Sequence, residues 1–223
     1  MPPQGIKNVQ ILFDTTNTRR KNMTFAQKIY MKQLVFATGN RNKVSEMNDI
    51  IGQYLPVVSM GEVGCTEDLP ETQDTLEGNA VQKADYLYDN YGQIDCFSED
   101  TGLEVDALGG APGVLTARYA GETKDPVANM TKLLTELGDT TQRGAQFRTI
   151  ICLILGGEKV LFEGICRGHI AQQMSGTGGF GYDPVFIPEG YQQTFADLDK
   201  NTKHSVSHRG KALRKLQTYL SAK

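Results

Sequence analysis

The chain has 223 residues, of which 39% are hydrophobic and 22% are charged, and its formal net charge is −3 at pH 7. This length and composition are enough for a folded core, which excludes a largely disordered protein. The small negative net charge gives no reason to expect long nucleic acid as a partner. No apolar stretch approaches the roughly 20 residues that span a membrane.

Four cysteines, at positions 65, 96, 152 and 166, form no CxxC pair and have no histidine at zinc-ligand spacing. We interpret them as reduced thiols, most of them in the core. Because there is also no apolar segment typical of a secretory signal, we expect a cytoplasmic protein.

Residues 1–31 differ in character from the rest of the chain. They are polar, basic in places and weakly periodic, whereas the pattern sharpens at Met31 into MKQLVFATGN. We expect residues 1–31 to be an N-terminal extension outside the catalytic fold and residues 32–223 to form one domain. The alternative is a transit peptide, because TRRKNMTFAQK lacks acidic residues, but the preceding segment is too weakly amphipathic to favour it.

The elements that follow predict an α/β fold. A short apolar strand over residues 34–38 ends at a glycine-containing turn, and apolar residues at 44, 47, 50 and 51 then indicate a helix. A second helix is predicted over residues 75–91, where Asp74 and Glu77 have the spacing of a capping box. Next, IDCFSEDTGLEV indicates a strand that runs into a sharp acidic turn.

The second half of the chain continues this alternation. Apolar residues between 127 and 137 indicate a third helix. Two β-rich segments, QFRTIICLIL and KVLFEGICRGHIA, are separated by Gly156 and Gly157, which is typical of a hairpin. A final helix is predicted from about Ser207.

The first candidate site is TGNRNK, at the junction of the first strand and helix. A helix N-terminus presents unpaired N–H groups and partial positive charge to a phosphate, Gly39 permits close approach of the backbone, and Lys43 adds a positive charge. The spacing is not that of a Walker A loop. A turn followed by a helix cap remains the alternative. The candidate residues are Thr38, Gly39, Asn40, Arg41, Asn42 and Lys43.

The second candidate site is Glu99-Asp100-Thr101-Gly102, where two adjacent carboxylates follow an apolar strand. Carboxylate oxygens at a strand end suit Mg²⁺ that also binds substrate phosphates. Glu71, in the acidic stretch TEDLPETQD, is a further candidate ligand. The alternative is a solvated acidic turn.

The third candidate site is GTGGFGYDPVF. Its glycines permit close approach of the backbone to a flat ligand, Phe180 and Tyr182 offer aromatic faces, and Asp183 accepts hydrogen bonds. The alternative is a glycine-rich hairpin with aromatic side chains in the core.

The fourth candidate site is NTKHSVSHRGKALRK, where Lys203, His208 and Arg209 gather at the start of the last helix. Ser207 is a plausible N-cap that also lies within reach of a ligand. Positive charge at a helix start is unfavourable unless an anion or acceptor faces it, which favours a binding role over a solvated basic surface.

Together these four segments resemble the inosine triphosphate pyrophosphatase family, also called Ham1 or RdgB-like. The resemblance covers about residues 32–221 and rests on TGNRNK, SEDTGLEVDALGGAPGVLTARYAG, GTGGFGYDPVF and SHRG. It implies an elongated α/β fold with a mixed, curved central sheet, flanking helices, two lobes and a central substrate cleft. It also implies Mg²⁺-dependent conversion of ITP, dITP or XTP to the monophosphate and pyrophosphate by a homodimer.

The resemblance further implies a role for each matching residue. Asp100 is the catalytic metal ligand and base for the attacking water, and Glu71 is a second metal ligand. Lys43 binds phosphate oxygens together with the rest of its turn. The implied substrate contacts elsewhere are Thr101, Phe180, Gly181, Tyr182, Asp183, Lys203, Ser207, His208 and Arg209. Many bacterial members have two aspartates where this chain has Glu99 and Asp100. We expect Glu99 to be catalytic together with Asp100 and Lys43, with its exact role left open.

Two other functions stay open at this point. A Maf-like nucleotide pyrophosphatase shares a phosphate loop between strand and helix but has a different base preference. A non-catalytic nucleotide-binding module needs the basic and aromatic segments but not the paired acids.

Overall fold

The computed structural model describes residues 34–52 and 57–222, so the predicted extension 1–31 lies outside the described residues. In chain order the elements are β1 (Leu34–Ala37), α2 (Arg41–Ile51), β2 (Val57–Ser59), η2 (Met60–Val63), α3 (Leu76–Asn90), β3 (Cys96–Val105), η3 (Asp106–Leu108), β4 (Pro112–Gly113), η4 (Thr116–Arg118), α4 (Pro126–Leu137), β5 (Gly144–Leu155), β6 (Glu158–Ile170), η5 (Asp183–Val185), β7 (Phe186–Pro188), α5 (Lys200–Val206) and α6 (His208–Ser221).

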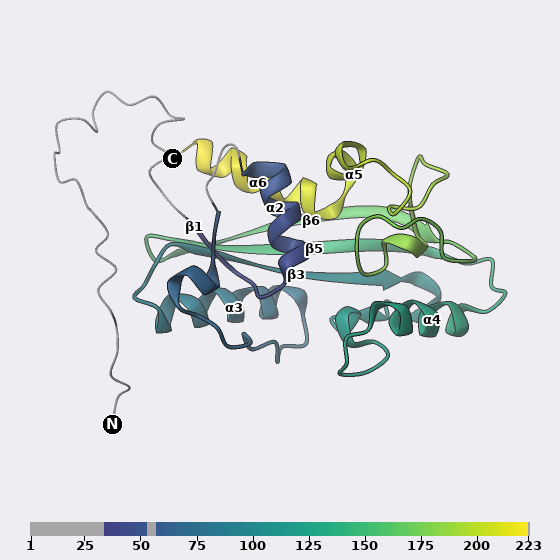
Figure 1. Cartoon of the computed structure of the whole chain (residues 1–223), viewed down its shortest axis with the longest axis horizontal. Helices are drawn as coiled ribbons and strands as arrows, with labels where there is room; N and C mark the ends of the chain where they lie inside the picture. Colours follow the sequence, from purple (N-terminus) through teal and green to yellow (C-terminus); the bar gives the residue numbers. More distant parts are fainter. Residues whose placement is uncertain (1–33, 53–56, 223) are drawn as a thin grey trace.

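The strands of the described residues form one seven-stranded mixed sheet in the order β2-β1-β3-β5-β6-β7, with β4 paired to β3. The β1 strand is parallel to β2 and β3, whereas β3, β5 and β6 pair in antiparallel register. The three long strands run along the elongated molecule and connect its two ends (Figure 1). The predicted α/β fold is therefore confirmed.

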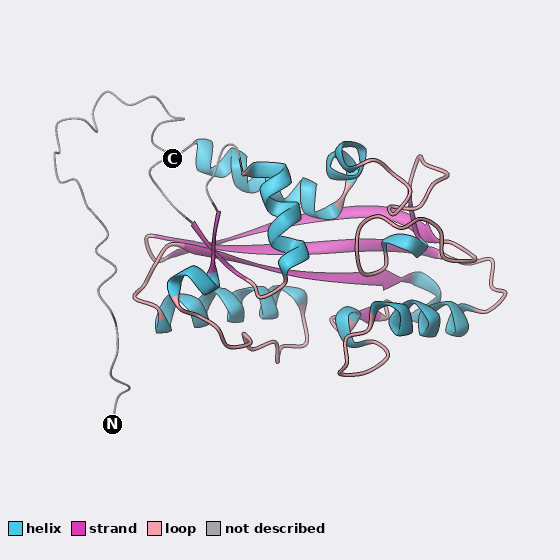
Figure 2. Ribbon diagram, in the orientation of Figure 1, coloured by secondary structure: helices cyan, strands magenta, loops and turns pink. Residues whose placement is uncertain are grey.

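Helices cover both faces of the sheet (Figure 2). Alternation along the strands sends Phe36 and Phe97 into one core with α2 and α6, and Val35 and Cys96 into another core with α3 on the opposite face. A third core, built on Phe147 and the α4 side chains, fills the other end of the molecule. The lobe of α2, α3 and α6 and the lobe of α4 thus share one continuous sheet.

The hairpin prediction at Gly156 and Gly157 is confirmed, because these residues join β5 to β6 with φ angles of 59° and 83°. The predicted acidic turn is wrong: β3 continues unbroken through Glu99 and Asp100, and every one of its residues is in register with β5. Pairing with β5 holds this segment extended, and nearby cations compensate its buried charge.

The predicted capping box of α3 is also wrong. The N-cap is Thr75, whose hydroxyl accepts from the backbone N–H of Gly78 at 3.0 Å. The Glu77 carboxylate pairs with Arg148 of β5 instead of returning to the helix start.

All four cysteines are buried and free, in agreement with reduced core thiols. In the part of the chain that the structure describes, no helix has the length and apolar character needed to cross a membrane.

Candidate functional site

A cleft of about 720 Å³ lies where α2, α3, β3, η4, the 176–186 loop and the start of α6 meet. Most of the predicted site residues line it: Thr38, Gly39, Asn40, Asn42, Lys43, Glu71, Asp100, Thr101, Phe180, Gly181, Tyr182, Asp183, Lys203, His208 and Arg209. Arg41, Glu99 and Ser207 do not. Segments that are far apart in sequence thus converge on one cavity.

The turn before α2 forms one wall of the cleft. Asn40 caps the helix, since its side-chain oxygen accepts from the backbone N–H groups of Asn42 at 3.0 Å and Lys43 at 3.3 Å. Burial lowers the pKa of Lys43 despite the opposing effect of Glu99, 3.3 Å from its Nζ. Arg41 is exposed at the first position of the helix. The predicted cap is therefore present, and Lys43 is the cation of this turn that reaches the cleft.

The adjacent carboxylates of β3 point to opposite faces of the sheet, as strand geometry requires. Glu99 faces α2 and α6, where Nε and Nη2 of Arg209 each donate to it at 2.6 Å. Burial by itself would raise the pKa of Glu99, but Arg209 and Lys43 outweigh it and hold that pKa well below its ordinary value. Glu99 therefore pairs with two cations on the face of the sheet opposite Asp100.

Asp100 faces α3, where it meets Lys83. Lys83 Nζ lies 2.9 Å from Oδ1 of Asp100 and 2.6 Å from Oε1 of Glu71, so one ammonium bridges the two predicted metal ligands. Burial opposes the charge on Lys83, but both carboxylates raise its pKa and keep it protonated. The same ammonium brings the loop of Glu71 to the strand of Asp100.

The glycine-rich loop at 176–181 lies beside two cations. Lys203 Nζ is 5.3 Å and Arg209 Cζ is 5.4 Å from the ring centroid of half-buried Phe180. Asp183 accepts from the backbone N–H of Phe180 at 2.7 Å and from Lys203 at 2.9 Å. A Cβ on Gly179, whose φ is +71°, would lie 2.0 Å from Oδ2 of Asp183, so this position requires glycine.

The two aromatic residues of this loop differ in their surroundings. Both line the cleft, but Phe180 is half-buried, whereas Tyr182 is only 3% exposed and donates its hydroxyl to the backbone oxygen of Thr116 at 3.0 Å. Tyr182 therefore agrees with the alternative of a core aromatic, and Phe180 is the ring available for a ligand.

A buried glutamate of α2 joins the basic side chains of the last two helices. Glu46 pairs with Lys203 at 2.7 Å and with Nη1 of Arg209. Burial acts to raise the pKa of Glu46, but Arg209 and Lys203 lower it to about 2. The guanidinium of Arg209 thus lies between Glu46 and Glu99, and all three of its nitrogens donate to them.

The start of α6 places His208 in the floor of the cleft. Ser207 is the N-cap of this helix, as predicted, and accepts from the backbone N–H of Gly210 at 3.1 Å. The His208 ring stacks on Phe147 at 4.5 Å between centroids, and within the described residues its Nδ1 has no hydrogen-bond partner. Burial is the main cause that lowers the pKa of His208 to about 3, so the ring is neutral at physiological pH.

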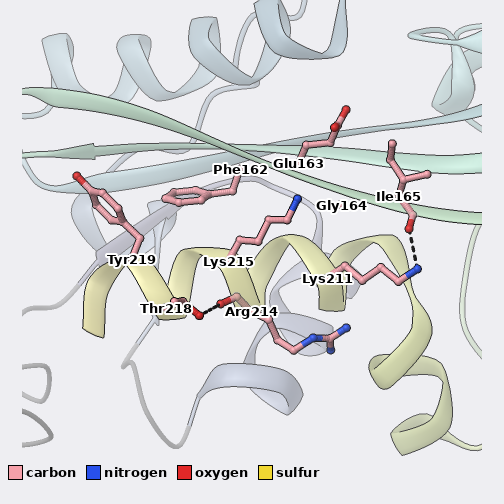
Figure 3. Close-up of a pocket in the computed structure, with 9 residues that line it drawn as sticks. All are labelled: Phe162, Glu163, Gly164, Ile165, Lys211, Arg214, Lys215, Thr218 and Tyr219. Atoms are coloured by element: carbon pink, nitrogen blue, oxygen red, sulfur yellow. Dashed lines mark hydrogen bonds between the residues drawn. The ribbon is translucent and has the colours of Figure 1, made fainter. Parts of the chain in front are cut away.

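A second depression lies between α6 and β6 and also carries basic side chains (Figure 3). Lys211 donates to the backbone oxygen of Ile165 at 2.9 Å, and Arg214 donates to the backbone oxygens of His204 and Ser205. These cations already have acceptors on the protein surface, so the depression is a weaker candidate than the cleft.

Comparisons with known proteins show the family of the chain. The model of the Ham1 family matches residues 34–219. The chain belongs to the Ham1 family. A relative named dITP/XTP pyrophosphatase from Flavobacterium psychrophilum is 52% identical over 82% of this chain and 96% of its own. A dITP/XTP pyrophosphatase from Bacillus subtilis is 41% identical over 87% of this chain and 100% of its own.

Solved structures of the Ham1 family have the same fold. A Ham1 protein from Coxiella burnetii superposes with a TM-score of 0.79 at 33% identity and covers 86% of this chain and 100% of its own. The Staphylococcus aureus Ham1 protein gives a TM-score of 0.77 at 38% identity, with coverage of 86% and 99%.

Two buried side chains of this Ham1 site, Lys83 and Glu46, were not identified from the sequence. Lys83 is 4% exposed and Glu46 is 7% exposed, and both lie on the face of an amphipathic helix that packs on the sheet. A charged residue within an apolar helical stripe is the signal that would have identified them, because such a residue is rarely buried without an opposite charge.

Proposed function

We propose that this chain hydrolyses the non-standard purine nucleoside triphosphates ITP, dITP and XTP to the monophosphate and pyrophosphate. The observation that carries the proposal is the arrangement of Glu71, Lys83 and Asp100 in the same cleft as Lys43 and Phe180. This arrangement combines paired carboxylates, phosphate-binding cations and an aromatic face for a base. The names of the relatives, dITP/XTP pyrophosphatase, support the same substrate class.

The donor set of the cleft fits Mg²⁺ as the proposed cofactor. Glu71 and Asp100 offer hard carboxylate oxygens, and both oxygens already contact one cation, the ammonium of Lys83. The described residues contain no group of three or more metal-ligating side chains. Two carboxylates agree with an ion that takes its remaining ligands from water and substrate phosphates. Bound there, Mg²⁺ would neutralise phosphate charge and lower the pKa of coordinated water.

Each of several cleft residues has its own role in the proposed reaction. In the proposed step the oxygen of a water attacks the α-phosphorus, Asp100 accepts the proton, and the bond between the α-phosphorus and the bridging oxygen breaks to release pyrophosphate. Lys43 stabilises the charge that develops on the phosphate oxygens. Lys83 keeps Glu71 and Asp100 in place, and Thr101 donates to Glu99 at 2.8 Å, which in turn holds Lys43.

The base site explains the proposed preference for a 6-keto purine. In the proposed binding mode Phe180 stacks on the purine. Lys203 and Arg209, which both lie close to the Phe180 ring, present donors to an oxygen of the base. The 6-amino group of adenine would bring a donor against these donors and leave buried groups unpaired.

A substrate panel tests the proposal. We expect pyrophosphate release from ITP, dITP and XTP at rates far above that for ATP, with EDTA abolishing the reaction. Asp100→Asn should bind ITP yet barely turn over. Comparable kcat/KM on all nucleotides would reject the base site, a pyrimidine preference would favour the Maf-like alternative, and binding without pyrophosphate release would favour a non-catalytic module.

We also propose that the enzyme is a cytoplasmic homodimer whose catalytic domain is residues 32–223. Free buried thiols support a reducing compartment, and the family match over residues 34–219 supports the domain limits. Light scattering of the purified chain tests the dimer, and full activity of a chain that starts at Met31 tests the extension.

A further inference from the structure

Arg118 lies at the end of η4 in the wall of the cleft, next to Glu71. Its Nη2 is 3.4 Å from the backbone oxygen of Glu71 and 3.7 Å from Oε2 of the same residue. Within the described part of the chain, Glu71 is the only polar partner of this side chain. Both contacts are long for a charge-assisted hydrogen bond, which is normally 2.7–2.9 Å.

Three other cations of the cleft have much closer partners. Lys83 and Lys203 each contact two carboxylates at 2.9 Å or less, and Arg209 donates from all three nitrogens. A guanidinium has five N–H donors in a planar fork. Arg118 therefore keeps donors that its protein partner does not use, and its side chain is 27% exposed.

The backbone that carries Arg118 is firmly held on both sides. Leu103 of β3 donates to Oγ1 of Thr116 at 2.8 Å. Asn129 of α4, only 2% exposed, donates to the backbone oxygen of Ala117 at 3.0 Å and accepts from the backbone N–H of Ala120 at 2.6 Å. A buried amide thus brackets the residues around Arg118, which fixes the backbone position from which its side chain extends.

We propose that Arg118 binds phosphate oxygens of the substrate tail and holds the pyrophosphate group. The proposal rests on the proposed function. The planar fork of Arg118 has unused donors that match the paired oxygens of a phosphate. A phosphate carries more negative charge than the carboxylate of Glu71, which lies 3.7 Å from the guanidinium. Arg118 comes from η4, close to the α4 lobe, whereas Lys43 and Lys83 come from the other lobe, so the tail contacts both lobes.

Product inhibition of the full chain tests the proposal. At fixed, saturating free Mg²⁺, Arg118→Met should raise the inhibition constant of pyrophosphate and the KM for ITP about 10- to 100-fold, the range for a lost charge-assisted contact. The inhibition constant of IMP, which lacks the tail, should stay within about twofold. Arg118→Lys keeps the charge but not the planar fork of donors. Its inhibition constant for pyrophosphate and its KM for ITP should lie between those of the unmodified chain and those of Arg118→Met.

Arg167→Met is the matched control, because Arg167 is exposed on β6 and does not line the cleft. It should leave all constants unchanged, and melting curves should show that each variant is folded. If Arg118 only positioned Glu71, its variant would need more free Mg²⁺ for half-maximal activity while pyrophosphate inhibition stayed unchanged. That result, or equal losses for pyrophosphate and IMP, overturns the proposal. Failure of the unmodified chain to release pyrophosphate from ITP would instead refute the proposed function and, with it, this role of Arg118.

Discussion

Replacement of Glu99 by glutamine tests how strongly the buried ion pairs stabilise the fold. Glu99 is 1% exposed, accepts two hydrogen bonds of 2.6 Å from Arg209 and lies 3.3 Å from Lys43. Glutamine keeps the shape but removes the charge and turns an N–H₂ donor toward other donors. Loss of one partner from a buried pair destabilises a protein by about 3–5 kcal/mol. For a domain of this size that corresponds to a fall in Tm of about 6–20 °C.

Urea unfolding at pH 7.5 measures this loss, and Glu104→Gln is the matched control. Glu104 lies on the same strand, but among the described side chains its hydrogen-bond donor is the neutral Gln146, at 2.6 Å, so its variant should lose far less stability. The pKa of Glu99 is lowered in the folded protein, so its contribution is complete above the ordinary glutamate pKa and declines as the pH falls below it. Equal losses for the two variants, or a Glu99→Gln effect below about 1 kcal/mol, would refute the reasoning.

Three further predictions concern other parts of the site. Lys83→Met should lower kcat for pyrophosphate release at least about 100-fold, because two carboxylates lose the ammonium between them; a loss below about tenfold would contradict this. The pKa of His208 rises from about 3 to 6.5 on unfolding, so the free energy of unfolding of the unmodified chain falls by about 2 kcal/mol between pH 7.5 and pH 5. His208→Gln should remove this part of the pH dependence. Parallel profiles for both chains would argue against a neutral His208. Gly164→Ala should prevent normal folding, since its Cβ would lie 2.0 Å from the backbone oxygen of His208. Gly61→Ala, with 3.9 Å to its nearest contact, should be nearly neutral, and similar melting curves would contradict the clash.

Local signals in the sequence predicted much of the fold. The hairpin at Gly156 and Gly157 and the helix start at Ser207 depend on short-range backbone chemistry, and both predictions are confirmed. The acidic turn predicted at Glu99 and Asp100 was wrong because pairing with β5, which is remote in sequence, keeps β3 extended at these residues. Local preference for a turn is therefore overruled by tertiary pairing at this position.

The candidate site was predictable where motifs present their side chains to the cleft, as at Lys43 and Phe180. The ion pairs behind these residues were not predictable in the same way. Glu46 and Arg209 are 163 positions apart, and no local pattern shows that they meet. Strand alternation did contain the information that Glu99 and Asp100 face opposite sides of the sheet, but only once the turn is replaced by a strand.

The pairing of charges in the cleft has a consequence for how a polyanion enters it. Five carboxylates (Glu46, Glu71, Glu99, Asp100 and Asp183) contact five cations (Lys43, Lys83, Arg118, Lys203 and Arg209), so these ten groups together have no excess charge. A nucleotide tail cannot simply be attracted to a basic surface here. In the proposed binding mode its phosphates compete with these carboxylates for the cations, except at the donors of Arg118 that Glu71 does not use.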